Sequence, residues 1–368
     1  MMDGLFGRLC GWENLWEAWV RASRGKRRMA SVASFEARLE ENLVTLGEEL
    51  ASGAWRPGPH VSFHIHEPKR RLISAAPFRD RVVHHALCNV TAPLLERSFV
   101  ADSFANRVGH GTHRALDACQ RHARRHDHVL AMDVQQFFPS VDHEILLGQL
   151  RAKIADDRVM ALAARVLEGG AGVHEGHRTT RYFDGDDLLA GLRPRGLPIG
   201  NLTSQLWANV YLTSFDHFVK RELRCPGYVR YVDDFRLFGD DWREMWRWRD
   251  AVAERLGSLR LVAHPRSQPR HVTEGVSFLG FRVWPSRRRV KARKVVYAGR
   301  RLRAMALRVR MGTAAPRELT ERVVAWVAHV SRANSMGLRK SVLRDVGHGG
   351  RSGERGAGSG GRGGIPEG

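Results

Sequence analysis

The sequence has few cysteines, no long apolar run and a shortage of acidic residues. Its four cysteines, Cys10, Cys88, Cys119 and Cys225, include no CxxC pair, which argues against a disulfide framework and a structural zinc ribbon. No stretch reaches the ~18 uninterrupted apolar residues of a membrane span, and the first residues lack the basic-then-apolar order of a signal peptide. These absences predict a cytoplasmic protein with no membrane partner and with reduced, mostly buried thiols.

An excess of positive charge indicates a polyanionic partner. The 368 residues include 60 Lys or Arg against 39 Asp or Glu, which gives a formal net charge of +21. Because 43% of the residues are hydrophobic, the chain has enough apolar side chains to fold, unlike a disordered basic tail. Two thirds of the charge, +14, falls in residues 285–345, which hold 17 Lys or Arg and only three acids. This imbalance favours phosphate contact over a merely solvated face.

Hydrophobic spacing predicts helices at both ends of the chain and an α+β region between them. Two amphipathic stripes in residues 1–60 are expected to pack in the core: Trp12, Leu15, Trp16, Trp19 and Val20, then Phe35, Leu39, Leu43, Leu46 and Leu50. From residue 61 onward, strand-like runs alternate with helical stretches, as in a sheet covered by helices. Residues 167–198 form an irregular insertion to which no chemistry is assigned.

The basic region has a helical face of its own, and the last residues change composition. The apolar residues of that face are Val323, Val324, Trp326, Val327 and Val330. Residues 347–368 are half glycine and carry three arginines, which predicts a disordered tail.

Three aspartates stand where apolar runs end. Asp133 follows the run 129–132, and Asp233 with Asp234 separates two strand-like runs, which predicts a hairpin with two carboxylates at its tip. Adjacent carboxylates repel each other, so a compensating cation is expected. Mg²⁺ prefers carboxylate and phosphate oxygens, and two ions about 4 Å apart can stabilise the attacking and leaving oxygens of a phosphoryl displacement. For an isolated Asp-Asp pair, the alternative is an exposed turn.

The sequence resembles the reverse transcriptases in six motifs that occur in that family's order. In chain order they are 69–74 (KRRLIS), 78–85 (FRDRVVHH), 133–140 (DVQQFFPS), 196–205 (GLPIGNLTSQ), 231–234 (YVDD) and 275–281 (GVSFLGF). The resemblance implies an α+β, right-hand polymerase fold with an α-helical thumb. In these terms, residues 1–60 are an N-terminal helical extension, 61–284 the fingers and palm, 285–346 a basic helical thumb and 347–368 the tail.

The resemblance also implies a role for individual residues. Asp133, Asp233 and Asp234 are expected to be catalytic and, with the Val134 carbonyl, to bind two Mg²⁺ ions. Phe138 is expected to exclude a ribose 2′-hydroxyl and so to select deoxynucleotides. The other expected nucleotide-binding residues are Lys69, Arg70, Arg71, Ile199, Gly200, Ser204 and Gln205. The expected nucleic-acid-binding residues are Gly280, Arg287, Arg288, Lys291, Arg293 and Lys294.

One departure from the family pattern indicates a subfamily. Most reverse transcriptases have QGxxxSP in the nucleotide-binding motif, whereas residues 199–205 read IGNLTSQ, which resembles the enzymes of diversity-generating retroelements. That resemblance implies copying of a template RNA into cDNA from a DNA or RNA primer and dNTPs, with errors at template adenines. A small basic accessory protein is the implied partner.

Two alternatives to that subfamily stay open, and so does one catalytic role. The first alternative is a defence-associated or retron-like bacterial reverse transcriptase, and the second is an intron-maturase-like RNA-binding protein. The family's general-acid lysine has no counterpart in 261–268, where His264 could give up a proton more readily than Arg266, so the general acid is unassigned.

Overall fold

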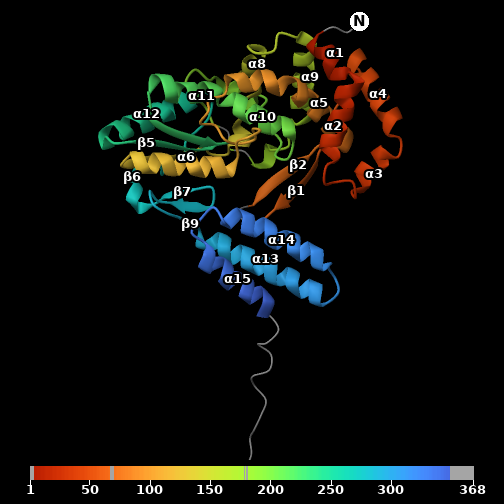
Figure 1. Cartoon of the computed structure of the whole chain (residues 1–368). Coiled ribbons are helices and arrows are strands. Elements are labelled where there is room, and N and C mark those ends of the chain that lie inside the picture. Colours follow the sequence, from red (N-terminus) through yellow and green to blue (C-terminus); the bar gives the residue numbers. More distant parts are fainter. Residues whose placement is uncertain (1–3, 67–69, 178, 180, 349–368) are drawn as a thin grey trace, which may run out of the picture. The chain divides into compact units, whose positions relative to one another are not determined.

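The computed structural model describes residues 4–66, 70–177, 179 and 181–348 (Figure 1). It divides into two compact units, Met1–His271 and Val272–Gly368. The boundary expected after residue 284 therefore differs from the structural one, because three short strands group with the C-terminal helices. Most of the expected tail, residues 349–368, lies outside the described residues, whereas 347 and 348 end the last helix.

Helices make up most of the first unit. They are α1 (Leu5–Cys10), α2 (Trp12–Ser23), α3 (Ala30–Glu36), α4 (Leu39–Ser52), α5 (Phe78–Leu95), α6 (Thr112–Arg125), α7 (Phe137–Ser140), α8 (His143–Arg151), α9 (Asp157–Gly169), α10 (Leu202–Tyr211), α11 (Thr213–His217) and α12 (Trp242–Ser258). Among the described residues, none of the helices combines the length and apolar character needed to cross a bilayer. All four cysteines are free and buried, which confirms the prediction of reduced, mostly buried thiols.

Two sheets complete the first unit (Figure 1). Strands β1 (Val61–Ile65) and β2 (Arg71–Ala75) form an antiparallel hairpin. A four-stranded antiparallel sheet has the order β4-β5-β3-β6; its strands are β3 (His128–Asp133), β4 (Gly227–Tyr231), β5 (Asp234–Gly239) and β6 (Pro269–His271). Helix α6 packs on β4 and β5, and α12 packs on β3 and β6. This helix-covered sheet fits the α+β architecture expected from the sequence.

The N-terminal stripes are buried only in part as predicted. In α2, Leu15 and Trp19 are buried, but Trp12, Trp16 and Val20 are 44%, 38% and 43% exposed, so the prediction that all five lie in the core is wrong. The buried residues of α2 are Leu15, Ala18, Trp19, Ala22 and Ser23, so the helix turns a face with small residues toward the core in place of Trp12, Trp16 and Val20.

The second stripe is confirmed as core, although two helices form it. Phe35 lies in α3, and the four leucines lie in α4, with a break at residues 37 and 38.

Asp142 caps α8 by accepting hydrogen bonds from the backbone N–H groups of Glu144 and Ile145, which fixes where the chain enters that helix after α7.

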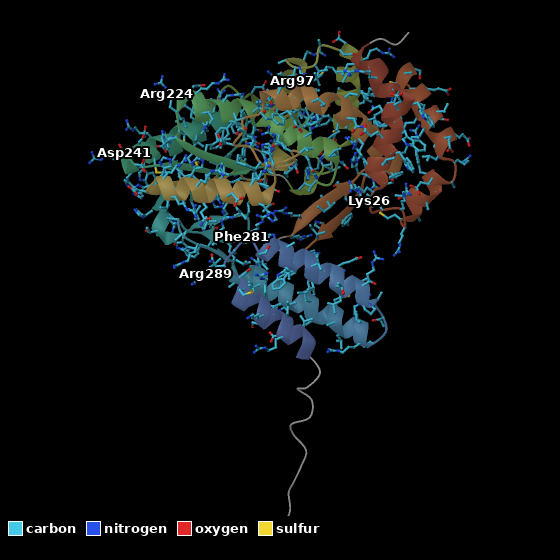
Figure 2. All side chains as sticks on the ribbon, in the orientation of Figure 1. Lys26, Arg97, Arg224, Asp241, Phe281 and Arg289 are labelled. Atoms are coloured by element: carbon cyan, nitrogen blue, oxygen red, sulfur yellow. The ribbon has the colours of Figure 1, made fainter. Side chains whose placement is uncertain are left out.

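The second unit is a small sheet joined to three helices. Its elements are β7 (Val276–Phe278), β8 (Phe281–Val283), β9 (Arg288–Val290), α13 (Ala292–Arg310), α14 (Pro316–Val330) and α15 (Met336–His348). The Phe281 ring lies 5.0 Å from the His329 ring of α14, whereas Arg289 on β9 is exposed (Figure 2). Of the predicted apolar face, Val330 is buried, but Val324 is 61% exposed, so its inclusion in the packed face is wrong.

Adjacent residues of α4 give a matched test of this packing. Leu43 is fully buried, whereas Val44 is 50% exposed. We expect Leu43→Ala to lower the free energy of unfolding by about 2–5 kcal/mol, because it leaves a cavity among α1, α2 and α4. Val44→Ala should change it by less than about 0.5 kcal/mol. Urea unfolding followed by circular dichroism measures both, and equal effects would contradict the packing described for α4.

Candidate active site

Strand pairing brings the predicted catalytic aspartates together at one end of the larger sheet. In the antiparallel ladder of β3 and β5, Asp133 lies opposite Asp234. In the ladder of β4 and β5, Tyr231 lies opposite Asp234, so Val232 and Asp233 alone connect the two strands. The predicted hairpin with carboxylates at its tip is therefore present, and the end of β3 lies beside it.

The hairpin turn has an unusual backbone conformation. Val232 has φ of +60°, a region that a β-branched residue rarely adopts, so surrounding contacts must hold it there. The Val134 N–H donates a hydrogen bond to the Asp233 carbonyl at 3.3 Å. The Arg230 guanidinium donates one to the Val232 carbonyl at 2.9 Å. Hydrogen bonds therefore hold the turn both to the segment that carries Asp133 and to β4, the strand that precedes the turn.

The carboxylates of Asp133 and Asp233 interact unfavourably with each other. Burial, followed by repulsion from Asp133, raises the pKa of Asp233 from 3.8 to about 6; Asp234 adds to the repulsion, and Arg71 opposes it. Asp234 differs because its carboxylate forms an ion pair with Arg236. The three carboxylates expected to bind metal are therefore not equivalent. Asp133 and Asp233 repel each other, whereas Asp234 is paired with Arg236.

This pair fits a Mg²⁺ site that the substrate completes. Within the described parts of the chain, no three His, Cys, Asp or Glu side chains are arranged to hold a metal ion by themselves. Mg²⁺ in enzymes is commonly bound by one or two carboxylates together with substrate phosphates, so two facing carboxylates are sufficient on the protein side. Burial and the neighbouring Asp133 carboxylate raise the pKa of Asp233, and a cation bound there would favour its charged form.

The segment 196–205, which is predicted to bind the nucleotide, lies against β2. The Ser74 N–H donates to the Ile199 carbonyl at 2.9 Å, and the Ala76 N–H donates to Asn201 Oδ1 at 3.3 Å. Gly200 has φ of +126°, and a Cβ there would lie 3.1 Å from Ile73 Cγ2. Glycine is therefore required at this position both by its backbone conformation and by the close approach of β2.

The remaining predicted nucleotide-binding residues differ in exposure. Arg70 and Arg71 are exposed at the start of β2, and Phe138 is half-buried with its ring 5.5 Å from that of Phe137. Gln205 is half-buried in the first turn of α10, whereas Ser204 is only 2% exposed and faces the interior. Lys69 lies outside the described residues.

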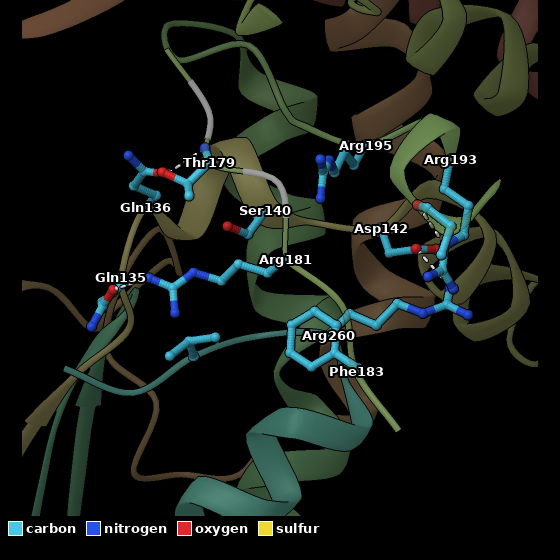
Figure 3. Close-up of a pocket in the computed structure, with 12 residues that line it drawn as sticks. Gln135, Gln136, Ser140, Asp142, Thr179, Arg181, Phe183, Arg193, Arg195 and Arg260 are labelled. Carbon is cyan, nitrogen blue, oxygen red and sulfur yellow. Dashed lines mark hydrogen bonds and ion pairs between the residues drawn. The ribbon is translucent and has the colours of Figure 1, made fainter. Parts of the chain in front are cut away.

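The insertion 167–198 contacts the segment that follows Asp133. Arg181 donates a hydrogen bond to Gln135 Oε1 at 2.6 Å, and the Thr179 N–H donates to Gln136 Oε1 at 3.4 Å (Figure 3). The buried His174 ring forms a 2.8 Å hydrogen bond with the Leu197 carbonyl. Sequence reasoning missed these contacts because the insertion is irregular and shows no periodicity.

A small basic cavity lies between the insertion and the segment that follows Asp133 (Figure 3). Its volume is about 30 Å³, which is room for little more than one water molecule. The arginines that line it are Arg181, Arg193, Arg195 and Arg260. Arg193 pairs with Asp186, and Arg260 pairs with Asp142 at 2.6 Å, so two of the four charges are neutralised within the insertion and its surroundings.

Residues 261–268 run beside the segment that carries Asp133. The His264 N–H donates to the Asp133 carbonyl at 2.8 Å, and the Gln135 N–H donates to the Val262 carbonyl at 2.8 Å. These bonds fix the backbone on the side of Asp133 away from β5. They place the His264 backbone beside that of Asp133 and assign His264 no role in proton transfer.

In the second unit, several predicted nucleic-acid-binding residues surround one tight turn. Leu279 and Gly280 connect β7 and β8 with φ of 47° and 87°. The Lys291 N–H donates to the Gly280 carbonyl at 3.0 Å, and Lys294 carbon atoms lie 3.7 Å from the position of a Cβ on Gly280. Gly280, Lys291 and Lys294 are therefore neighbours.

Three further predicted arginines lie on the same unit. Arg287 covers the Trp284 ring, with its guanidinium carbon 5.0 Å from the ring centroid. The backbone of Arg288 is clamped by Asn334, which accepts from its N–H at 3.1 Å and donates to its carbonyl at 3.0 Å. Arg293 stands in the first turn of α13.

Replacing Asp233 with asparagine should stabilise the fold. The folded chain keeps the Asp233 proton up to about pH 6, whereas an ordinary aspartate loses it near pH 3.8, so stability falls as the pH rises through this window. We expect Asp233→Asn to raise the free energy of unfolding at pH 7.5, without divalent ions, by roughly 1–3 kcal/mol.

Urea unfolding at pH 5 and pH 7.5 measures this effect. The gain should shrink toward low pH, where wild-type Asp233 is itself protonated. A variant that is no more stable than the wild type at pH 7.5 would show that burial and Asp133 do not raise the pKa of Asp233 in the folded chain.

The chain is similar to several known proteins. YkfC of Escherichia coli is 26% identical over 303 residues, which cover 71% of this chain and 76% of that protein. The group II intron-encoded protein LtrA of Lactococcus lactis is 25% identical over 183 residues, which cover 49% of this chain but only 28% of LtrA. A telomerase structure from Candida albicans is similar over 69% of this chain and 52% of its own, with 9% identity and a TM-score of 0.44.

A family model gives the most direct assignment. The model described as reverse transcriptase (RNA-dependent DNA polymerase) matches residues 65–283, more than half of the chain. This range contains β2 to β8 and therefore both ladders that position Asp133 and Asp233. The chain belongs to the reverse transcriptase family.

Proposed function

We propose that Asp133 and Asp233 form the catalytic centre at which this reverse transcriptase extends a primer on an RNA template. The observation that carries the proposal is the convergence of the two carboxylates at one sheet end, with the pKa of Asp233 raised to about 6 by burial and by Asp133. Mg²⁺ held there, with the Val134 carbonyl and Asp234 as further ligands, would neutralise charge developing on the transferred phosphate.

The surrounding side chains suit a deoxynucleoside triphosphate. Arg71 is exposed at the start of β2 and acts electrostatically on Asp233, so it is close enough to contact phosphate oxygens bound there. Ile199 and Gly200 lie beside the same strand. The Phe138 carbonyl accepts from the Leu197 N–H at 2.8 Å, which keeps this aromatic residue beside the nucleotide-binding segment, where its ring can exclude a 2′-hydroxyl.

The second unit offers a surface for template and primer. Lys291 and Lys294 flank the Gly280 turn, and a groove of about 410 Å³ lies between α13 and α14. Aromatic side chains such as Tyr297 and Trp326 line this groove together with basic ones. Aromatic rings beside cationic groups are suited to nucleic acid, because bases stack on the rings while the cations pair with phosphates.

We assign the enzyme to the diversity-generating retroelements, with a small basic accessory protein as its partner. The segment 199–205, IGNLTSQ, supports this assignment. At the position where most family members have a glutamine, Ile199 has no side-chain hydrogen-bonding group, which relaxes control of base geometry. An intron-associated role is the second candidate, because two of the relatives are named a group II intron-encoded protein and, from Arabidopsis thaliana, nuclear intron maturase 2.

Loss of the carboxylates should abolish synthesis. We expect the double variant Asp233→Asn, Asp234→Asn to lower primer extension on an RNA template by roughly 10³-fold or more, because it removes the charges that bind metal. Asp250→Asn, on an exposed aspartate of α12, is the matched control and should retain full activity. RNA-dependent synthesis by the double variant at the wild-type rate would remove the catalytic assignment.

The subfamily assignment has a separate test in the fidelity of synthesis. We expect Ile199→Gln to reduce misincorporation opposite template adenine by roughly 10-fold, because the amide restores a hydrogen-bonding group. Sequencing of the cDNA gives this rate, and errors opposite the other three bases serve as the internal reference. An unchanged error rate opposite adenine would exclude Ile199 from the mechanism of error.

A further inference from the structure

A fully buried ion pair lies next to the turn that carries Asp233, and none of the roles predicted from the sequence involves it. Arg230 in β4 and Asp216 in α11 have no exposed side-chain surface. The guanidinium binds the carboxylate through two bonds, from Nε to Oδ1 at 2.7 Å and from Nη2 to Oδ2 at 2.6 Å. The Tyr228 hydroxyl donates a third bond to Asp216 Oδ1 at 2.7 Å. The carboxylate is therefore satisfied by two different partners.

The remaining nitrogen of Arg230 connects this pair to the active site. Nη1 donates to the Val232 carbonyl at 2.9 Å and to Asn209 Oδ1 at 3.1 Å. Val232 immediately precedes Asp233, and Asn209 stands in α10, the helix that begins in the nucleotide-binding segment. Four donated bonds of one guanidinium thus join the catalytic turn, α10 and α11.

Stability alone does not account for this arrangement. A buried ion pair contributes little net stability compared with apolar side chains of the same volume, because both charges lose their hydration. Its planar guanidinium, however, directs several hydrogen bonds in fixed directions. The Val232 carbonyl needs such a restraint, since the turn holds a β-branched residue at φ of +60°.

We propose that Arg230 is a positioning residue that sets the place of Asp233 through the Val232 carbonyl, and that Asn209 couples this position to α10. The inference rests on the proposed function, because it assumes that Asp233 binds the metal. Arg230 itself, fully buried, touches neither substrate nor metal. Its removal should therefore alter the geometry of the carboxylates rather than remove a reacting group.

Three variants separate positioning from structural support. Arg230→Lys keeps the positive charge but cannot make all four bonds at once. Asn209→Ala leaves the ion pair intact and removes the link from Arg230 to α10, together with the 2.8 Å hydrogen bond that Asn209 Nδ2 donates to the Ala105 carbonyl. Tyr228→Phe is the matched control, because it removes a buried hydrogen bond to the same Asp216 carboxylate without touching Val232 or Asn209.

Kinetics on an RNA template give the first readout. We expect Arg230→Lys to lower kcat by roughly 10- to 100-fold, because a small displacement of a catalytic group has effects of this size, while the KM for dNTP changes by less than about 3-fold. Asn209→Ala should raise that KM several-fold, since it disturbs α10. Tyr228→Phe should keep wild-type kcat and KM even if its unfolding midpoint falls.

Mn²⁺ binding to the protein without substrate gives a second readout that does not depend on polymerisation. Electron paramagnetic resonance should show roughly 10-fold weaker binding by Arg230→Lys and unchanged binding by Tyr228→Phe. Asp233→Asn, as the reference, should lose the site. Mn²⁺ binding that depends on Asp233 in a wild-type chain without synthesis would overturn the proposed function and leave the positioning role standing.

Two results would overturn the inference about Arg230. One is a folded Arg230→Lys variant with wild-type kcat and Mn²⁺ affinity. The other is a Tyr228→Phe variant that loses kcat as severely as Arg230→Lys, since that would make the network purely structural. Should Arg230→Lys fail to fold, Asn209→Ala decides alone, and a wild-type KM and kcat in that variant would refute the coupling.

Discussion

The pairing of β3 with β5 is the constraint on which the catalytic end of the sheet depends. It places Asp133 opposite Asp234 and leaves Asp233 in the two-residue turn beside it. A slip of one residue would exchange the two faces of β3 and move its carboxylate away from the turn. The segment 261–264 supports the register from the other side, through backbone bonds to Asp133 and Gln135.

The same constraint holds two negative charges together at the expense of stability. Burial of the Asp233 carboxylate and its repulsion by Asp133 oppose folding at neutral pH, and the conformation of Val232 adds backbone strain. The fold tolerates this because backbone hydrogen bonds and the Arg230 guanidinium fix the turn on several sides. Active sites often combine backbone strain and like charges with rigid surroundings, because the arrangement that catalysis needs lowers the stability of the fold.

Much of this site could be predicted from local sequence, whereas contacts distant in sequence could not. The hairpin around Asp233 followed from two apolar runs with carboxylates between them, a short-range pattern. The ion pair of Asp234 with Arg236 depends on the direction in which the two side chains point. The exposure of Trp16 depends on which face of α2 is turned toward the core. The contact of Arg181 with Gln135 spans an irregular insertion that has no periodicity to interpret.

The grouping of β7, β8 and β9 with the C-terminal helices bears on how this polymerase could evolve. The Gly280 turn and the two lysines beside it are encoded in one continuous stretch that forms its own compact body. A recombination event near residue 272 would therefore transfer this whole unit, with the residues that we propose bind nucleic acid, in one step. Descendant proteins could then carry a different C-terminal unit and keep the site of Asp133 and Asp233 unchanged.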